Sequence, residues 1–262
     1  MTEFYTTQLG AGLGHIDETK RLLDLWSPGN TATQLYNKAL ALGAFPGTTA
    51  RRLRNIVVEC FAPRYLSNGG APAIHLQIMV GRLSSNDLNQ LFLLFTCRAN
   101  SILADFVRGV YWHKYAAGFR SITNQDATAF VQRSVDRGKT RKVWEESTIR
   151  RVSAYLTGCC ADYGLLENGQ KRERRIIPLS ITTTTVAYLA YELHFRGLGD
   201  NAVINHFDWS LFGLTRDETI DEIKRLAGKN LLILQSAGEA VKISWKFESM
   251  EQLCNVLAAS QF

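Results

Sequence analysis

Long apolar runs are missing from this 262-residue sequence. Leu91–Phe95 is a run of five strongly apolar residues, and no apolar run comes near the about 18 residues that a membrane-spanning helix needs. The first residues also lack the basic stretch followed by an apolar core that marks a signal peptide. We therefore expect a cytoplasmic protein with no membrane partner, in which Leu91–Phe95 forms the buried face of a helix.

Cysteine is scarce and shows no pairing pattern. The five cysteines include no Cys-x-x-Cys pair, and the five histidines have no cysteine or carboxylate at ligand spacing. The simplest interpretation is that the thiols are small core residues in a reducing compartment. We expect no metal and no cofactor, and free thiols, four of which fall on predicted apolar faces, at Cys60, Cys97, Cys159, Cys160 and Cys254.

Catalytic motifs are absent as well. The sequence contains no H-E-x-x-H, no G-x-S-x-G and no phosphate-binding G-x-x-x-x-G-K. The glycines of Gly10–Gly14 superficially resemble a dinucleotide-binding loop, but the last one falls a position early and no apolar strand precedes it. A tight turn before a helix is the better interpretation. Nothing in the sequence supports an enzyme.

Basic charge is present, and it is concentrated. The chain carries a net charge of +6, and Val131 to Ser180 holds eleven Lys or Arg against six Asp or Glu. Within this region, Trp144 to Tyr163 has the apolar spacing of a helix. Its predicted buried stripe is Ile149, Val152, Leu156, Cys159, Cys160 and Tyr163, and its predicted outer face is Ser147, Arg151, Ala154 and Gly158.

A hairpin is expected directly after this helix. Leu165–Glu167 reads as a short strand, Asn168-Gly169 is a strong hairpin-turn signal, and residues 171–175 form a basic return limb. A helix with a small, cationic outer face followed by a basic hairpin is typical of a winged helix. The alternative is a solvated sheet edge, kept basic to discourage pairing with other edges. The candidate DNA-binding residues here are Arg141, Lys142, Arg150, Arg151, Lys171, Arg172, Arg174 and Arg175.

A helix-turn-helix is expected near the N-terminus. Thr31 and Gln34 form a capping box that opens one helix, and Thr48 or Thr49 can cap a second that runs to about Phe61. Three arginines at the start of the second helix are unfavourable beside the positive end of its dipole. Contact with phosphates would relieve that repulsion, which makes Arg51, Arg52 and Arg54 further candidate DNA-binding residues. The alternative is a plain helical hairpin with solvated arginines.

The rest of the chain completes a mainly α fold of helix-turn-helix and winged-helix-like units with short β-hairpins. We expect a helical region over residues 1–66, a central domain over 67–180 that begins with a loop to residue 84, and a C-terminal domain over 181–262. The last region is acidic, with seven basic and ten acidic residues. Its helix from Thr215 and its hairpin within Leu231–Phe247 suggest a second winged-helix-like unit, one that packs against a protein rather than DNA.

Several segments resemble the BrxA family of bacteriophage-exclusion (BREX) defence systems. They are Tyr5-Thr6-Thr7, Leu22–Trp26, Thr48–Arg52 and Phe61–Leu66. The resemblance implies a mostly helical, cytoplasmic accessory component that binds DNA and works beside other BREX components. It supplies no catalytic residue.

The leading hypothesis is therefore a non-enzymatic protein that binds double-stranded DNA within a BREX system. Two alternatives remain open at this point: a protein-interaction scaffold within a defence complex, and an RNA-binding or transcription-regulatory protein.

Overall fold

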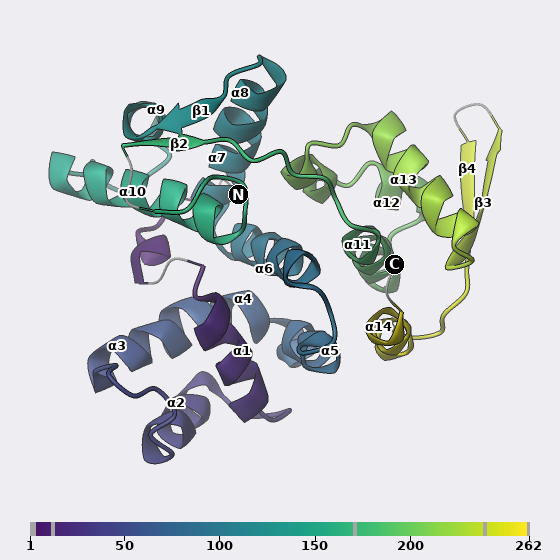
Figure 1. The fold of residues 1–262 in the computed structure, drawn as a ribbon, viewed down its shortest axis with the longest axis horizontal. Coiled ribbons are helices and arrows are strands. Elements are labelled where there is room, and N and C mark those ends of the chain that lie inside the picture. Colours follow the sequence, from purple (N-terminus) through teal and green to yellow (C-terminus); the bar gives the residue numbers. More distant parts are fainter. Residues whose placement is uncertain (1–3, 12–13, 170–171, 238–239, 261–262) are drawn as a thin grey trace. The chain divides into compact units, whose positions relative to one another are not determined.

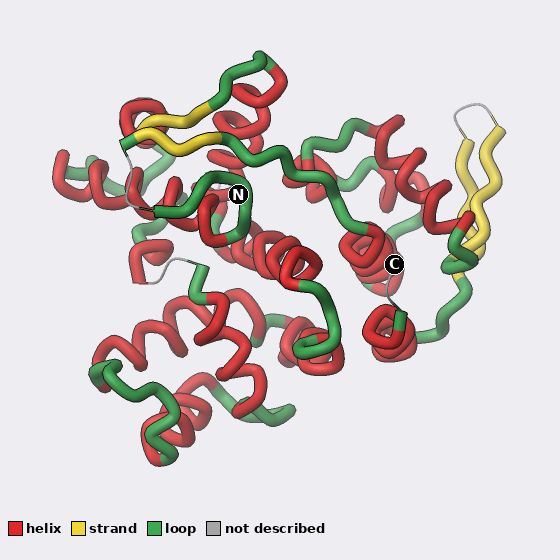
Figure 2. The backbone as a smooth tube through the Cα atoms, viewed as in Figure 1, coloured by secondary structure: helices red, strands yellow, loops and turns green. Residues whose placement is uncertain are grey.

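The computed structural model describes residues 4–11, 14–169, 172–237 and 240–260. The described chain is mostly helical and has two small antiparallel sheets of two strands each, which confirms the mainly α prediction (Figure 2). It forms two compact units (Figure 1). Unit 1 comprises Met1–Ile74 and Phe92–Leu179, and unit 2 comprises His75–Leu91 and Ser180–Phe262. The three-region division stays a prediction, because compactness does not show which parts fold alone.

The N-terminal part of unit 1 is built from helices. After the 3-10 turn η1 (Gln8–Ala11), α1 (Ile16–Leu25) and α2 (Ala32–Ala41) lead to one long helix, formed by α3 (Ala50–Arg54), the π-helical stretch η2 (Asn55–Phe61) and α4 (Ala62–Tyr65). The predicted capping box is present, since the Thr31 side chain accepts from the Gln34 amide and the Gln34 side chain accepts from the Thr31 amide. Thr49 caps α3.

The expected loop over residues 67–84 is wrong. After the short turn η3 (Asn68–Gly70), the chain forms α5 (Ala71–Met79), in which Ala73, Leu76 and Met79 are fully buried at a spacing of three residues. The loop-forming residues Asn68, Gly69 and Gly70 are confined to the turn, where all three have a positive φ. Gly70 is required there, because a Cβ at this position would lie 2.7 Å from the Trp26 ring.

The long apolar region that follows is helical as expected, but it is broken. It consists of α6 (Ser85–Ala99), α7 (Ser101–Phe106), the π-helical stretch η4 (Val107–Trp112) and α8 (His113–Ala116). The chain bends by 114° between α6 and α7, at Asn100. In the described residues no single helix is long and apolar enough to cross a membrane, and only this bent pair passes the same criteria when taken together.

Unit 1 ends with two helices and a small sheet. The order is β1 (Ser121–Thr123), α9 (Asn124–Asp136), α10 (Glu146–Asp162) and β2 (Glu173–Arg175), with β1 and β2 antiparallel. The expected hairpin exists only as a bridge between Leu166 and Ile176, supported by a hydrogen bond from the Glu167 amide to the Arg175 carbonyl. The main partner of the return limb is β1. This pairing was missed because β1 has three residues and only one apolar side chain.

Unit 2 contains α11 (Thr183–Phe195), α12 (Asp200–Ile204), the 3-10 turn η5 (Phe207–Phe212), α13 (Arg216–Gly228), β3 (Leu232–Ala237), β4 (Ala240–Trp245) and α14 (Met250–Ala259). β3 and β4 form the predicted antiparallel hairpin. The Tyr191 hydroxyl joins its ends, because it donates to the Leu231 carbonyl (2.6 Å) and accepts from the Lys246 amide (2.9 Å).

Unit 2 also takes in the end of α5 and the start of α6. His75 shares a 2.8 Å hydrogen bond with Tyr188 of α11, and Gln90 of α6 binds both the Ser180 carbonyl and the Thr182 amide at 2.9 Å. These contacts explain why a segment from the middle of the sequence belongs with the C-terminal residues.

Candidate nucleic-acid interface

Helix α10 has the amphipathic form that its sequence predicts. All six residues of the predicted apolar stripe are buried: Ile149, Val152, Leu156, Cys159, Cys160 and Tyr163. On the predicted outer face Ser147, Arg151 and Ala154 are exposed, but Gly158 is buried, so the exposed face is shorter than expected. The buried Trp144 anchors the chain just before the helix begins.

The cations of α10 differ in how free they are. Arg150 is exposed and forms an ion pair with Glu146 one turn earlier (3.1 Å), which offsets part of its charge. Arg151 is exposed and makes no ion pair with any residue that the structure describes. Arg151 is therefore the cation of this helix that is most available to a phosphate.

Of the three arginines in the return limb, two face solvent. Arg172 and Arg175 are exposed. Arg174 is half-buried and donates from Nη1 to the Glu167 carbonyl oxygen (2.9 Å), so it holds the hairpin together instead of facing solvent. Lys171 lies outside the described residues. Of the acidic neighbours, Glu173 accepts a hydrogen bond from the Ser121 hydroxyl across the β1–β2 pair.

The loop between α9 and α10 adds Arg141 and Lys142, both exposed. The start of this loop is fixed by a three-residue network. Lys139 donates from Nζ to the Asp105 carboxylate (2.8 Å) and to the Tyr5 hydroxyl (2.9 Å), and the Tyr5 hydroxyl donates to the same carboxylate. The Tyr5 amide also binds the Lys139 carbonyl at 2.8 Å. Lys139 is thus committed to the fold.

The protonation states in this network follow from its geometry. Burial is the main cause that raises the pKa of Tyr5 to about 12, so the phenol stays protonated. Burial alone would raise the pKa of Asp105, but the hydrogen bonds from Lys139 and Tyr5 outweigh it and lower the pKa below its ordinary value.

Replacing Asp105 with asparagine is expected to lower the stability of the protein by about 1 kcal/mol at neutral pH. The asparagine oxygen can still accept a hydrogen bond, but the ion pair with Lys139 and the charge assistance of both hydrogen bonds to the partly exposed carboxylate are lost. A carboxyl group whose pKa is lower in the folded state than in the unfolded state stabilises the folded protein at pH values above its unfolded pKa. This stabilisation is lost as the pH falls through the folded pKa. Thermal melts of both proteins should therefore differ at neutral pH, and the difference should shrink as the pH falls below about 4. The exposed Asp24, replaced in the same way, serves as the control, and a gap that persists in acid would contradict the assignment.

The three N-terminal candidates lie on a separate helix of unit 1. Arg51, Arg52 and Arg54 of α3 are all exposed, and Leu53, Ile56, Val57 and Cys60 form the buried side of the same helix, as predicted. The Thr49 hydroxyl caps the helix by accepting a hydrogen bond from the Arg52 amide, and the arginine guanidinium groups take no part in this cap. Arg52 lies near the buried His15, whose pKa is lowered mainly by burial and to a smaller degree by the arginines.

The sequence prediction missed further exposed cations beside the same elements. Arg120 directly precedes β1, and Arg133 and Arg137 lie on and just after α9. Arg120 becomes part of this surface only because its carbonyl accepts the amide of Ile176, next to β2. Arg133 and Arg137 could have been found from their position in the basic region, since both fall within the same stretch as Arg141.

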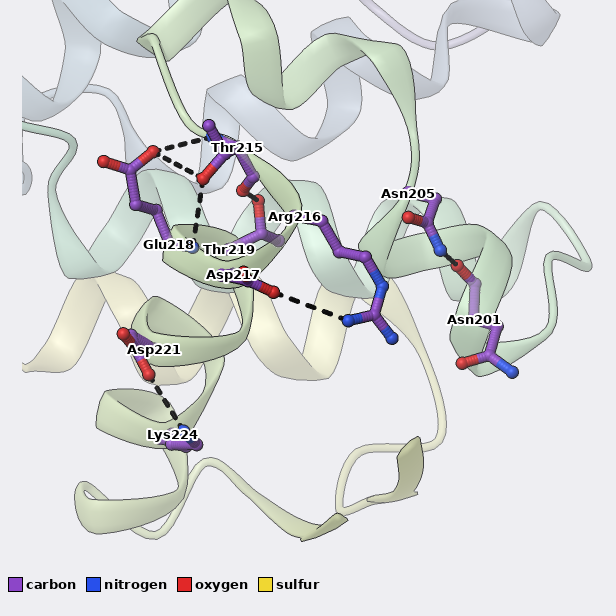
Figure 3. A network of polar contacts seen from close by, with 9 residues as sticks. All are labelled: Asn201, Asn205, Thr215, Arg216, Asp217, Glu218, Thr219, Asp221 and Lys224. Atoms are coloured by element: carbon purple, nitrogen blue, oxygen red, sulfur yellow. Dashed lines mark hydrogen bonds and ion pairs between the residues drawn. The ribbon is translucent and has the colours of Figure 1, made fainter. Parts of the chain in front are cut away.

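The corresponding helix of unit 2 is electrostatically different. The carboxylates near the start of α13 are engaged within the helix (Figure 3). The Glu218 carboxylate accepts a hydrogen bond from the amide of the N-cap residue Thr215, Asp217 pairs with Arg216 (3.6 Å), and Asp221 pairs with Lys224 (2.9 Å). Glu222 pairs with Arg225. This helix therefore presents paired charges to solvent rather than a cationic face, and the described part of α13 offers no row of unpaired cations.

Among the residues that the structure describes, no group of three or more His, Cys, Asp and Glu residues could hold a metal ion. All five cysteines are free and buried. Burial raises the pKa of the thiols of Cys159 and Cys254 to about 12.

Comparison with protein families gives a match to the BrxA model over residues 3–192. The chain belongs to the BrxA family. Membership of this family supports the assignment of the protein as a component of a BREX system. The match includes all the candidate residues of α3, α10 and the hairpin, and it ends before the end of α11.

A structural comparison adds a fold relative. The crystal structure of an uncharacterized protein from Magnetospirillum magneticum is similar with a TM-score of 0.58 and 18% sequence identity, over 73% of this chain and 94% of that chain. At this identity the similarity shows the fold alone. No curated protein matches the sequence.

Proposed function

We propose that this protein is a non-enzymatic component of a BREX system that binds double-stranded DNA through α10 and through the hairpin of residues 165–176, whose return strand β2 pairs with β1. The observation that carries the proposal is the order of the elements: α8, β1, α9, α10 and then β2, which returns to pair with β1. Exposed cations lie on α10 and on β2. This is the element order of a winged helix, in which the helix corresponding to α10 enters the major groove and the hairpin contacts the backbone.

The surface of α10 suits close approach to a duplex. Ser147 and Ala154 are small and exposed on either side of Arg151, so the helix can lie against a groove without steric obstruction. Around it, Arg172, Arg175, Arg141 and Lys142 supply charge for phosphate contacts. Such contacts fix the position of a protein on DNA but carry no sequence information.

We assign a second region of DNA contact to α3. Its arginines belong to the second helix of a helix-turn-helix formed by α2 and α3, and their charges lie at the start of the helix, where they gain from an anion. The other BREX components are the proposed protein partners, and unit 2, with its paired charges on α13, is the part we assign to them.

Duplex binding through several phosphates makes affinity strongly dependent on salt. The logarithm of the binding constant should fall linearly with the logarithm of salt concentration, with a slope of about −0.9 for each phosphate contacted. Fluorescence anisotropy with a labelled duplex, titrated at several salt concentrations, measures this slope. Unrelated duplex sequences should bind within a small factor of one another.

The same titration separates the competing functions. Equal binding of duplex DNA and duplex RNA would favour an RNA-binding role, since a basic helical surface can bind either by shape. Absence of duplex binding even at low salt would contradict the proposal and favour the scaffold role.

A further inference from the structure

The turn between α8 and β1 carries two large exposed aromatic rings. Tyr115 is 42% exposed and Phe119 is 55% exposed, although aromatic side chains of this size are mostly buried in a folded protein. Tyr115 lies in the last turn of α8, and Phe119 follows Gly118 in the connection to β1. Figure 1 shows this connection between the helical region and the β1–β2 sheet. The proposed DNA-binding mode does not use them.

The local backbone holds Phe119 in place. The Gly118 amide binds the Tyr115 carbonyl and the Phe119 amide binds the Lys114 carbonyl, both at 3.0 Å, and Gly118 has φ +78°. These are the two hydrogen bonds of a Schellman motif. The Lys114 ammonium lies 4.8 Å from the centroid of the Phe119 ring and pairs with Asp126 at 2.7 Å. The Schellman motif thus sets the backbone of Phe119, and the Lys114 ammonium lies over its ring, while the residue remains 55% exposed.

Tyr115 is held in a similar way by neighbouring rings. It is stacked on Tyr111, with parallel planes and centroids 6.4 Å apart, and Trp112 meets it edge to face at 5.6 Å. Tyr111 in turn donates its hydroxyl to the Ile177 carbonyl at 2.6 Å. A planar ligand that stacks on Tyr115 would therefore lose little affinity to side-chain ordering.

Cations accompany the two rings. Arg120 follows Phe119 directly and is exposed, and the exposed Arg175 lies opposite Ser121 in the β1–β2 pair. The nearby carboxylates are engaged, Asp126 by Lys114 and Glu173 by the Ser121 hydroxyl. Fixed aromatic rings beside exposed arginines match a ligand that alternates planar bases with phosphates.

We propose that Tyr115 and Phe119 stack with unpaired bases of single-stranded DNA while Arg120 and Arg175 bind its phosphates. Because Arg175 also belongs to the proposed duplex interface, the strand is a single-stranded extension of the bound duplex, and in this respect the inference rests on the proposed function. The protein would then favour junctions between duplex and single-stranded DNA over blunt duplexes.

The test compares three DNA ligands in fluorescence anisotropy: a blunt duplex, the same duplex with a single-stranded tail, and the same tail made of abasic nucleotides. The full-length protein should bind the tailed duplex roughly tenfold more tightly than the blunt one, which is the effect of about one stacked base. The abasic tail keeps its phosphates but cannot stack, so it should give a much smaller gain. This comparison uses the wild-type protein and does not depend on any variant folding.

Substitutions then assign the effect to the two rings. Tyr115→Leu with Phe119→Leu should remove the preference for the tail and leave blunt-duplex affinity unchanged, whereas Phe207→Leu, at another exposed aromatic residue, should keep it. Circular dichroism checks that the variants fold, and the single Phe119→Leu variant replaces the double one if it does not.

The outcomes separate this inference from the proposed function. Two results overturn the inference but not the proposed function. One is binding of the blunt duplex without any preference for the tailed one, and the other is a preference for the tail that persists in the leucine variants or with the abasic tail. Binding of the tailed duplex, without any binding of the blunt duplex or of the duplex with the abasic tail, overturns the proposed function and leaves the stacking site standing.

Discussion

Reversing the charge of Arg151, Arg172 and Arg175 together is expected to lower the affinity for duplex DNA by on the order of a thousandfold at about 0.1 M salt. The reason is counterion release: each bound phosphate releases nearly one counterion, and this gain is lost for each phosphate that the variant no longer binds. All three side chains are exposed, so the fold should survive. The triple glutamate variant should also show a salt slope that is less steep by about 0.9 for each phosphate that it no longer binds. Anisotropy titrations at several salt concentrations measure both effects.

A matched control separates position from net charge. Arg82, Lys229 and Lys242 are exposed cations of unit 2, and their replacement by glutamate changes the net charge of the protein by the same amount. The control should retain most of the wild-type affinity. If both triple variants lose affinity equally, the binding depends on overall charge and the assignment to α10 and the hairpin is wrong.

Replacing Arg64 with alanine is expected to destabilise the protein by about 3 kcal/mol, through a cavity and the loss of buried hydrogen bonds. Arg64 is only 2% exposed. Its Nη1 approaches the Gly14 carbonyl (3.4 Å) and the Tyr163 hydroxyl (3.5 Å), and that hydroxyl also donates to Gly14 (3.2 Å) and shares a hydrogen bond with Thr96 (2.7 Å). The side chain thus joins the N-terminal loop to the C-terminal end of α10.

Denaturant unfolding followed by circular dichroism measures this loss of stability. Arg52→Ala, an exposed arginine on the same continuous helix, is the control and should change stability by no more than about 0.5 kcal/mol. Similar losses in both variants would show that the burial of Arg64 contributes little.

Helix α10 could be predicted because its apolar residues repeat at helical spacing over several turns, and this signal is local. The same holds for the capping box at Thr31 and for the β3–β4 hairpin, where buried Val241 and Ile243 alternate with more exposed neighbours. Signals of this kind depend only on residues a few positions apart, so they survive without knowledge of the tertiary fold.

What could not be predicted depends on distant partners. The pairing of β2 with β1 joins residues about fifty positions apart, and Arg174 becomes half-buried only because the Glu167 carbonyl lies within reach. The burial of Arg64 likewise follows from tertiary contacts with Gly14 and Tyr163. The error at α5 was different, since loop-forming residues in the preceding turn hid a short apolar helix.

The path of the chain between the two units limits how the protein can be divided. The chain passes from one unit to the other three times, near residues 74, 91 and 179. A fragment that ends at residue 179 would therefore still carry residues 75–91. It would lack Tyr188 of α11, which binds His75, and also Ser180 and Thr182, which bind Gln90. Leu76, Met79 and Leu88, all buried in the full chain, would lose partners and promote aggregation. Isolating unit 1 therefore requires excising residues 75–91 and joining the flanking residues with a linker, as for a domain that carries an insertion.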